Sequence, residues 1–526
     1  MIGVNLQLFG GFDGTIKQAD LSDIQALWWD VIEPKDMQLP IGKTTIATTD
    51  ENGYINLDLS DVTSLSIGGS GFLALYKLDD VDHEASPIFS GKTTTSDIVS
   101  GIDMFDSGWE RPTDWPVLDA LVDGVEKAQG VYAIYDIETA GNGIALICEG
   151  DYHVDWGDGS NEDVASGVTV EHSFDFSNVN LSEITSEGYK CAVITITPQD
   201  GSHLTKVDFG TRHSIFDQLC LIPWLDIVIN SSYLTTLNVS GPNVAVLLEQ
   251  FIIGQCGDVS GYYLFEDCKS LQSVKISNLD TLTSLSRMFY GCTSLQSIRP
   301  FDFSSMGSMS LFATFEDCYS LRSVKLINVT ETYTLSDTFN GCYGLQSVLI
   351  SGSSSLNMSH AFEECYSLQS ISIIGCTISS MSYMFYNCYS LQVAPWLDTS
   401  AVRYMSYTFY GCRSLQLIPL YDTSIVVYID YAFRYCTSLI TIPLFDFSKI
   451  TNSDYAFRDC PSLKWAKTLN MTCYFSLTDC SLDPEALNAV YTGLGTVTDT
   501  SISVTGNWGT GSDDPSIATA KGWTVQ

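Results

Sequence analysis

The sequence predicts a mainly β protein of several domains: an N-terminal β domain, a β-sandwich, then a long solenoid of repeated coils with a C-terminal cap. Three observations predict this fold. A motif recurs every 23–26 residues through the second half of the chain, short alternating runs fill the first half, and a helix-start signal follows the last repeat. The 526 residues are enough for three or four domains.

The first element is a small β domain, predicted over residues 1–107. Alternating apolar residues begin at Val4, reappear at 54–59 after an Asn52-Gly53 turn, and appear again at 72–78. The opening VNLQLFGG resembles the N-termini of phage head and tail structural proteins. This resemblance implies that the region docks on a virus particle.

A β-sandwich is predicted over residues 108–202. The runs VYAIYD, IALICEG, VTVEHSF and YKCAVITITP have the composition of strands, and a WGDG turn lies between the second and third of them. The stretch DYHVDWGDGS…EHSF…CAVITI resembles the polycystic-kidney-disease-type (PKD), immunoglobulin-like sandwich. Together with the preceding RP-x-DW segment it also resembles a module of phage fibre proteins, where it precedes leucine-rich repeats.

Acidic side chains and two histidines gather around this turn, so a calcium site or an acid–base pair competes with a plain hairpin. The cluster comprises Asp155, Asp158, Asn161 and Asp163, with His153 and His172 nearby. The ligand spacing of an EF-hand is absent. Glycines that free the backbone and aspartates that bond local amides favour a structural hairpin. We therefore expect no metal and no cofactor.

The third element is a solenoid, predicted over residues 203–482. Its motif F-x-x-C-x-[SG]-L occurs nine times, with Phe always three residues before Cys and Leu three after it. The nine cysteines are Cys268, Cys292, Cys318, Cys342, Cys365, Cys388, Cys412, Cys436 and Cys460. Nine registered copies indicate coils that bury their apolar sides against one another. The first coils, HLTKVDFG and YLTTLNVSG, are degenerate, as terminal coils usually are.

The structure of one coil follows from its residue pattern. In L-x-x-[IV]-x-[LI], as at Leu368, Ile371 and Ile373, apolar side chains point inward from a short strand, and strands of successive coils pair in parallel about 4.8 Å apart. Phe and Cys fill the interior opposite the strand. The residue before Cys is mostly Gly, Asn or Asp, which predicts a tight turn with positive φ.

The cysteines have three interpretations: buried thiols, disulfides or metal ligands. Cysteine tolerates full burial as a small apolar residue. There is no CxxC pair, and the six histidines are scattered. The apolar N-terminus lacks a basic segment, since the first lysine is Lys17, so we expect folding in a reducing cytoplasm. Buried thiols are the resulting prediction.

Two segments show the repeat most clearly, LDTSAVRYMSYTFYGCRSLQLIPLYDTS and FRYCTSLITIPLFDFSKITNSDYAFRDCPSL. They resemble the BspA-like leucine-rich repeats of bacterial surface proteins and bacteriophage fibres. The resemblance covers residues 203–482. It implies a leucine-rich-repeat solenoid that presents a surface for binding.

A capping unit is predicted over residues 483–526. Asp483 suits a helix N-cap, Pro484 suits the first helical position, and Leu487 and Val490 share one apolar face. Two strand-like runs, ISVTG and GWTVQ, follow. The segment GNWGTGSDDPSIATAKGWTV resembles the C-terminal unit that closes such repeats in phage tail proteins.

The candidate binding surface is a row of tyrosines beside the cysteines. The residue after Cys is Tyr in four consecutive coils, so these rings should stack along the solenoid. The candidate residues are Tyr319, Tyr343, Tyr366, Tyr389, Tyr386, Tyr410 and Arg413, with further tyrosines at Tyr383, Tyr404, Tyr407, Tyr428 and Tyr431. Tyrosine gives rigid amphipathic contact area at low entropic cost, which suits a sugar or a protein. A ladder that only stabilises its own stack is the alternative.

Charge and motifs exclude several functions. The net charge of −38 repels phosphate backbones and anionic lipid, so neither nucleic acid nor membrane is an expected partner. Adjacent carboxylates recur at Glu266-Asp267, Glu316-Asp317 and Glu363-Glu364. One member of each pair occupies the turn position, unlike the facing pair of a glycosidase. No P-loop, dinucleotide-binding or GxSxG motif is present, and no catalytic residue is expected.

These observations lead to one functional hypothesis and three alternatives. The hypothesis is a non-enzymatic bacteriophage structural protein, a tail or head fibre that docks on other virion proteins through its N-terminal region and presents its repeats to a host surface glycan or protein. We expect a homo-oligomer or many copies on the virion, assembled in the host cytoplasm. The alternatives are a capsid decoration protein, a bacterial surface adhesin and a glycan-degrading fibre.

Overall fold

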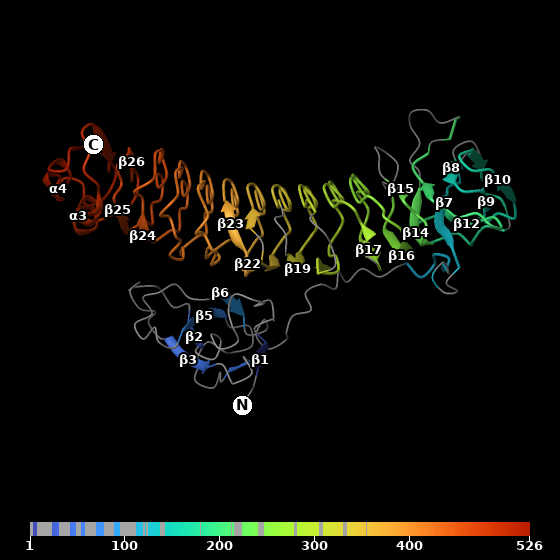
Figure 1. Ribbon diagram of the computed structural model, residues 1–526, viewed down its shortest axis with the longest axis horizontal. Coiled ribbons are helices and arrows are strands. Elements are labelled where there is room, and N and C mark those ends of the chain that lie inside the picture. Colours follow the sequence, from blue (N-terminus) through green and yellow to red (C-terminus); the bar gives the residue numbers. More distant parts are fainter. Residues whose placement is uncertain are drawn as a thin grey trace. The chain divides into compact units, whose positions relative to one another are not determined.

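The computed structural model shows a mainly β protein with a leucine-rich-repeat solenoid (Figure 1). It describes six strands within residues 1–111 and, from residue 112 on, the chain apart from 119–120, 122–124, 137–141, 179, 212, 215–222, 240–246, 278–280, 305–308, 330–333 and 354. Two compact units divide the chain. We call Phe105–Val324 with Leu335–Leu345 the first unit, and Met1–Met104 with Lys325–Thr334 and Gln346–Gln526 the second unit.

Six strands form two antiparallel sheets in the N-terminal region, which confirms the predicted β content. β1 (Val4–Gln7) pairs with β4 (Tyr54–Leu57). The other sheet has the order β3-β2-β5-β6 and comprises β2 (Ile24–Asp30), β3 (Lys43–Thr48), β5 (Ser70–Lys77) and β6 (Phe89–Thr94). The Asn52-Gly53 turn lies outside the described residues. The domain boundary at residue 107 stays a prediction.

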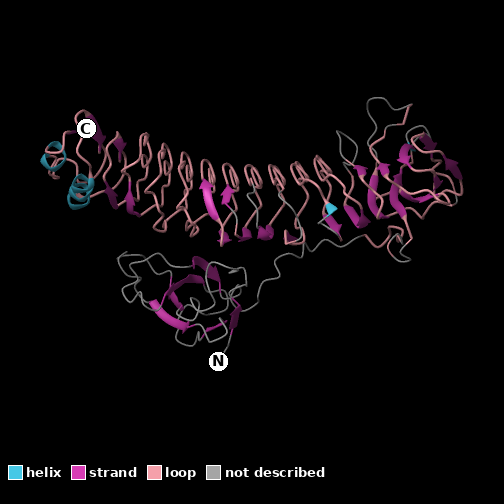
Figure 2. Ribbon diagram, in the orientation of Figure 1, coloured by secondary structure: helices cyan, strands magenta, loops and turns pink. Residues whose placement is uncertain are grey.

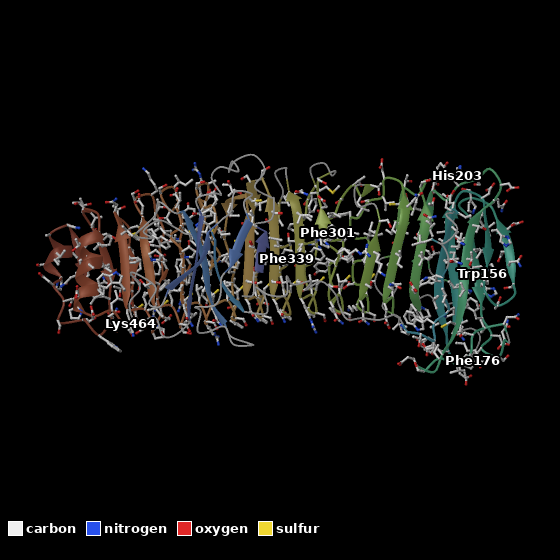
Figure 3. The ribbon with its side chains drawn as sticks, turned by 90° about the horizontal axis from the view of Figure 1, so that it is seen from below. Trp156, Phe176, His203, Phe301, Phe339 and Lys464 are labelled. Carbon is white, nitrogen blue, oxygen red and sulfur yellow. The ribbon has the colours of Figure 1, made fainter. Side chains whose placement is uncertain are left out.

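Two sheets pack together where the β-sandwich is predicted. One contains β7 (Lys127–Ile134), β9 (Tyr152–Asp155), β10 (Asn161–Val164) and β12 (Lys190–Pro198), and the other contains β8 (Gly143–Glu149) and β11 (Thr169–Ser173). Tyr132 on β7 donates a hydrogen bond from its hydroxyl to the carbonyl oxygen of Gly143 on β8, at 2.8 Å. Trp156, labelled in Figure 3, is buried at the WGDG turn.

Both sheets of the sandwich continue into the repeats. The first sheet extends through β14 (Trp224–Ser231), β16 (Gln250–Cys256) and β17 (Ser273–Ile276), and the second through β13 (Lys206–Asp208) and β15 (Thr236–Asn238). β14 pairs antiparallel with β7, whereas β14, β16 and β17 pair in parallel as repeat strands do. Both sheets therefore cross the boundary predicted at residue 202, and the sandwich covers the open end of the first coils.

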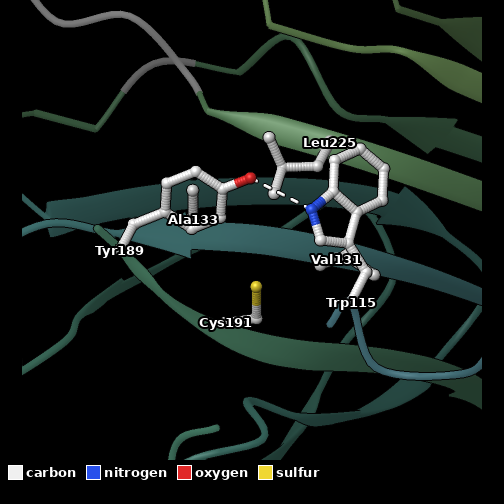
Figure 4. Close-up of a cluster of buried hydrophobic side chains, with 6 residues drawn as sticks. All are labelled: Trp115, Val131, Ala133, Tyr189, Cys191 and Leu225. Atoms are coloured by element: carbon white, nitrogen blue, oxygen red, sulfur yellow. Dashed lines mark hydrogen bonds between the residues drawn. The ribbon is translucent and has the colours of Figure 1, made fainter. Parts of the chain in front are cut away.

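An apolar cluster and a carboxylate join the sandwich to the first coils. The cluster comprises Trp115, Val131, Ala133, Tyr189, Cys191 and Leu225 (Figure 4). Within it, Trp115 Nε1 donates a hydrogen bond to Tyr189 Oη at 3.0 Å. The carboxylate of Glu126 accepts hydrogen bonds from Leu204 N and Ser231 Oγ, both at 2.7 Å. The sandwich and the first coils are therefore joined by a common apolar core and by hydrogen bonds, not by a linker.

The coils contain the short parallel strands that the repeat pattern predicts. In the second unit β20 (Ser347–Gly352) pairs with β22 (Ser370–Ile374), β21 (Ser355–Asn357) with β23 (Thr377–Ser380), and β24 (Thr441–Asp446) with β25 (Trp465–Leu469), all in parallel. Two further repeat strands are β18 (Phe301–Asp302) and β19 (Ser323–Val329). Figure 2 shows that loops and turns make up much of each coil.

Phenylalanine rings stack through the interior of the coils. In the first unit the centroids of Phe265, Phe289, Phe315 and Phe339 lie 5.3, 5.4 and 5.5 Å apart in succession. In the second unit those of Phe362, Phe385, Phe409, Phe433 and Phe457 lie 5.6, 5.2, 5.4 and 5.0 Å apart. All nine rings are buried. Burial of these rings is the main apolar contribution to the stability of each coil.

The repeat cysteines are buried thiols, as predicted, but they also form a hydrogen bond that the sequence does not reveal. The thiol donates to the carbonyl oxygen of the motif Phe in the preceding coil. Cys412 Sγ lies 3.0 Å from Phe385 O, and Cys436 Sγ lies 3.1 Å from Phe409 O. Serine would keep the hydrogen bond but lose apolar volume, and alanine would remove it, leaving Phe385 O with only the bond from the backbone N–H of Cys388 at 3.1 Å. Cysteine meets both demands.

We expect the motif cysteines to be inert in the folded protein. Burial raises the pKa of thiols such as Cys318 and Cys412, and only the thiolate is a good nucleophile. Among the described cysteines, Cys473 alone is partly exposed. A thiol reagent should therefore modify Cys473 in buffer and the motif cysteines only in denaturant, as measured by reagent absorbance with peptide mapping.

Cys473→Ser is the matched control for this titration. It should remove the mapped reaction at residue 473 and leave the protection of the motif thiols unchanged. Rapid modification of Cys412 in the folded chain would contradict the buried-thiol assignment.

Each coil turns through two residues with positive φ. The residue before Cys is one of them, as predicted, with φ of 58° at Asp267 and 71° at Gly411. The other lies five residues before Cys and is often tyrosine, with φ of 57° at Tyr407. A bulky side chain rarely adopts this conformation. Bonds between coils hold it, since Tyr407 N donates to Asp430 O at 2.9 Å and Gly411 N donates to Arg434 O at 2.8 Å.

The C-terminal cap confirms its sequence signals. α3 (Pro484–Gly493) starts at the N-cap Asp483, whose carboxylate accepts a hydrogen bond from Ala486 N at 2.8 Å. β26 (Phe475–Ser476), β27 (Thr500–Ser503) and β28 (Trp523–Val525) form a parallel sheet, with α4 (Ser516–Thr519) before β28.

A buried asparagine ends the column of thiols. Cys480 still donates to Phe457 O at 3.2 Å, although Leu477 replaces the motif Phe. The next donor is Asn507, whose Nδ2 lies 2.7 Å from Leu477 O. Asn507 therefore takes the place that a cysteine holds in a further coil, and the cap pairs the last open carbonyl.

Candidate binding surface

The tyrosines directly after the motif cysteines stack, as predicted, within each unit. The rings of Tyr319 and Tyr343 lie 4.7 Å apart in the first unit, and those of Tyr366 and Tyr389 lie 4.9 Å apart in the second. The guanidinium of Arg413 lies over the Tyr389 ring at 5.1 Å. This row therefore ends on a cation–π contact.

A second row occupies the position two residues before Cys. Tyr386 and Tyr410, both predicted site residues, stack with centroids 4.9 Å apart. The same position is Arg434 and then Arg458 in the next two coils. At this position, the tyrosine hydroxyls of two coils are therefore followed by the arginine guanidiniums of the next two.

The longest tyrosine stack lies five residues before Cys, at a position that sequence reasoning recorded but did not place in the site. Its members in the second unit are His360, Tyr383, Tyr407, Tyr431 and Tyr455, with successive centroid distances of 4.6, 4.6, 4.6 and 5.1 Å. Tyrosine at this position in four successive coils was the signal that could have found it.

The second and third rows are neighbours and form one continuous surface. Tyr383 and Tyr386 lie 5.7 Å apart, Tyr386 and Tyr407 6.4 Å, and Tyr407 and Tyr410 5.6 Å. We call Tyr383, Tyr386, Tyr407, Tyr410, Tyr431, Arg434, Tyr455 and Arg458 the tyrosine–arginine face. Its tyrosine rings are half-buried because stacking covers their flat sides. Ring edges and hydroxyls are what the face presents to solvent.

Four phenols of this face, those of Tyr383, Tyr386, Tyr407 and Tyr410, have raised pKa values and stay protonated well into the alkaline range. Burial, with a smaller contribution from the neighbouring phenols and Asp430, raises the pKa of Tyr407 to about 12. Burial also raises the pKa of Tyr383, Tyr386 and Tyr410. Within the described part of the chain, the hydroxyls of Tyr383, Tyr407 and Tyr410 bond no protein group. They are therefore neutral donors and acceptors open to a partner.

The WGDG cluster is a hairpin turn, as its glycines and aspartates predict. Asp155 Oδ1 accepts a hydrogen bond from Gly157 N at 2.9 Å, and Asp158 Oδ1 accepts one from Ser160 N at 3.0 Å. His172 Nε2 lies 2.9 Å from Asp158 Oδ2 and its ring stacks on Trp156. Across the described residues, no group of three or more His, Cys, Asp or Glu side chains is arranged to hold a metal ion.

The adjacent carboxylates also sit as the repeat pattern predicts. Asp267, Asp317 and Glu364 occupy the turn before Cys, with φ of 58°, 61° and 59°. Each pair therefore follows the bend of its coil, and its two carboxylates do not face each other across a substrate bond as those of a glycosidase do.

No helix in the described part of the chain has the length and apolar character needed to cross a bilayer.

Comparison with known proteins identifies the repeats. Residues 259–392 match the BspA type leucine rich repeat region, in six copies. Residues 356–470 match a family described as a Mycoplasma protein of unknown function, DUF285. No curated protein matches the chain. Neither matching family is a phage fibre module or a PKD-type sandwich, so those two resemblances stay predictions.

Two solved structures of leucine-rich-repeat proteins are similar to part of the chain at low identity. A leucine rich cell surface protein of Faecalibacterium prausnitzii is 17% identical, with 56% of this chain and 86% of that chain covered and a TM-score of 0.26. A leucine-rich-repeat protein of Leptospira interrogans is 12% identical, with 56% and 96% covered and a TM-score of 0.19. Likeness at this level carries no inference about binding.

Proposed function

We propose that this chain is a non-enzymatic adhesion protein of the cell-surface leucine-rich-repeat type, which attaches to a surface glycan or protein through its tyrosine–arginine face. The observation that carries the proposal is the pair of adjacent rows, in which stacked rings present unbonded hydroxyls beside two guanidiniums. A bacterial surface adhesin was one alternative from the sequence, and the BspA type match favours it.

The stack favours binding because it removes the entropic cost of ordering the tyrosines. Each ring of the Tyr383–Tyr407–Tyr431 series is held between neighbours 4.6 Å away. A partner therefore meets hydroxyls that are already fixed in position, and such preorganisation increases affinity.

We expect removal of three hydroxyls to weaken attachment by about tenfold or more, since each lost hydrogen bond costs about 0.5–1.5 kcal/mol. The variant is Tyr383→Phe/Tyr407→Phe/Tyr410→Phe in the full chain, which keeps the rings and the stack. The measurement is binding of fluorescent protein to whole bacterial cells and to cultured animal cells, by flow cytometry.

Tyr262→Phe is the matched control, because Tyr262 is an exposed tyrosine of the first unit outside the face. It should bind as the unmodified chain does. Equal binding by the triple variant, or no binding by the unmodified chain to either cell type, would remove the face from the proposed function.

The phage hypothesis is a second proposal, favoured by the resemblance of residues 4–11 and 111–159 to virion proteins. It uses the same face on a particle, with the N-terminal region docked on other virion proteins and the chain present in several copies. Detection of the chain in purified phage particles would support it, whereas detection on the envelope of intact cells would support the adhesin.

A further inference from the structure

The charge of this chain is distributed unevenly, and the tyrosine–arginine face lies where acidic residues are scarce. The whole chain has a net charge of −38. Residues 381–470 nevertheless hold seven lysines and arginines, six aspartates and no glutamate. The coils that carry the face therefore have a slight positive charge.

The change occurs at one repeat position, two residues before Cys. Three of the five earlier coils place glutamate there, at Glu266, Glu316 and Glu363, and the other two place Tyr290 and Asn340. The later coils place Tyr386, Tyr410, Arg434 and Arg458 there. A solenoid repeats its geometry, so glutamate stands at this surface position only in earlier coils and arginine only in later ones.

Arg434 is held in place by its own coil and the next. Its Nε donates to Asp459 Oδ2 at 2.9 Å, and its Nη2 donates to Tyr435 Oη at 2.8 Å. Its guanidinium lies over the rings of Tyr431, Tyr435 and Tyr455, at 5.6, 4.6 and 5.4 Å. Its Nη1 donors bond no group in the described part of the chain.

Arg458 lies beside the same Asp459 carboxylate but does not form the hydrogen bond to it that Arg434 does. Its Nε lies 3.7 Å from Asp459 Oδ2, and among the described residues this buried nitrogen has no hydrogen-bond partner. Its guanidinium lies over Tyr455 at 5.4 Å. Two guanidiniums thus share one aspartate, which leaves one positive charge and several donors at a partly exposed site.

We propose that the tyrosine–arginine face binds an acidic polysaccharide, whose carboxylates pair with Arg434 and Arg458 while its hydroxyls bond the neighbouring phenols. The assignment rests on the proposed function and names its partner class. Guanidinium forks match the geometry of a carboxylate, and phenol rows exchange hydrogen bonds with sugar hydroxyls. The coils that carry the face have seven lysines and arginines against six aspartates, so their local charge does not oppose an acidic chain as the rest of the protein does.

The test is binding of the full chain to immobilised polygalacturonate, compared with the same polymer after methyl esterification. The acid form should bind and the neutral ester should bind about tenfold more weakly or not at all, because a charge-assisted hydrogen bond contributes about 1.5–3 kcal/mol. Arg434→Gln/Arg458→Gln should lose affinity for the acid form by a similar factor. Arg403→Gln, an exposed arginine at another position of the same coils, should not.

The other outcomes distinguish a failure of this inference from a failure of the proposed function. Equal binding of acid and ester, or stronger binding to dextran sulfate than to polygalacturonate, overturns the carboxylate assignment. No binding to any of the three polymers, with cell attachment still lost in the Tyr→Phe triple variant, overturns the polysaccharide and leaves the adhesion proposal standing. Thermal unfolding of each variant verifies that it folds, and Arg434→Lys/Arg458→Lys should bind between the other two forms because it keeps charge without the fork.

Discussion

Replacing Phe409 with alanine is expected to lower the free energy of unfolding by about 3–5 kcal/mol, because it opens a cavity in the middle of the phenylalanine column. The ring is fully buried and stacks on Phe385 and Phe433 at 5.2 and 5.4 Å. Neighbouring coils cannot close over the gap, since backbone bonds at both turns fix their spacing. Urea unfolding followed by circular dichroism measures the loss.

Phe312→Ala is the control for this variant, because Phe312 is an exposed phenylalanine of another coil. Its effect should stay within about 0.5 kcal/mol, the usual range for a surface site. If both variants lose the same free energy of unfolding, the column of phenylalanine rings does not stabilise the solenoid more than a surface residue does.

Replacing Trp224 with alanine is expected to cost a similar amount, about 3–5 kcal/mol, and to destabilise sandwich and first coils together. Trp224 is 1% exposed and makes edge contacts with Tyr132 of the sandwich and Phe209 of the repeats, both at 5.2 Å. The indole of Trp224 also packs directly on Gly130, so closely that a Cβ on that residue would lie 2.4 Å from the ring. The measurement is hydrogen exchange of β7 and β14, which should accelerate in parallel.

Trp508→Ala is the matched control, because Trp508 is the same residue type with 76% of its surface exposed in the cap. It should leave both the stability and the exchange of β7 and β14 unchanged. Acceleration in β14 alone after Trp224→Ala would show that the sandwich folds independently of the solenoid, and the shared sheet would then not couple them.

The fold of the repeats could be predicted because every coil makes the same local demands. Phe, Cys and Leu recur in register, and residues such as Asp267 and Asn387 that tolerate positive φ stand at the turn. Periodicity of this kind reports burial directly, since a position that is apolar nine times must face the interior. The helix after Asp483 was predictable for the same local reason, a cap followed by an apolar face.

The candidate site was predicted only in part, for a reason that concerns contacts between coils. The sequence shows which positions are tyrosine, and it correctly predicts that Tyr366 and Tyr389 stack. It does not show that the rows two and five residues before Cys touch across coils, as Tyr386 and Tyr407 do. Tyr407 has a φ of 57°, a conformation that is rare for a bulky side chain and that the pattern of residues does not predict.

The repeat pattern is enough to predict one coil: its length, its buried Phe and Cys, its turn before Cys and the capped end of the solenoid. It does not predict how coils are joined, namely that thiols bond the preceding coil, that sandwich sheets run into the repeats, and that hydroxyls and guanidiniums form one face. Burial and turn preference are properties of a residue and its near neighbours, whereas contacts between coils are not. A hydrogen bond from Cys412 to Phe385 or a stack of Tyr383 on Tyr407 exists only when separate coils lie side by side.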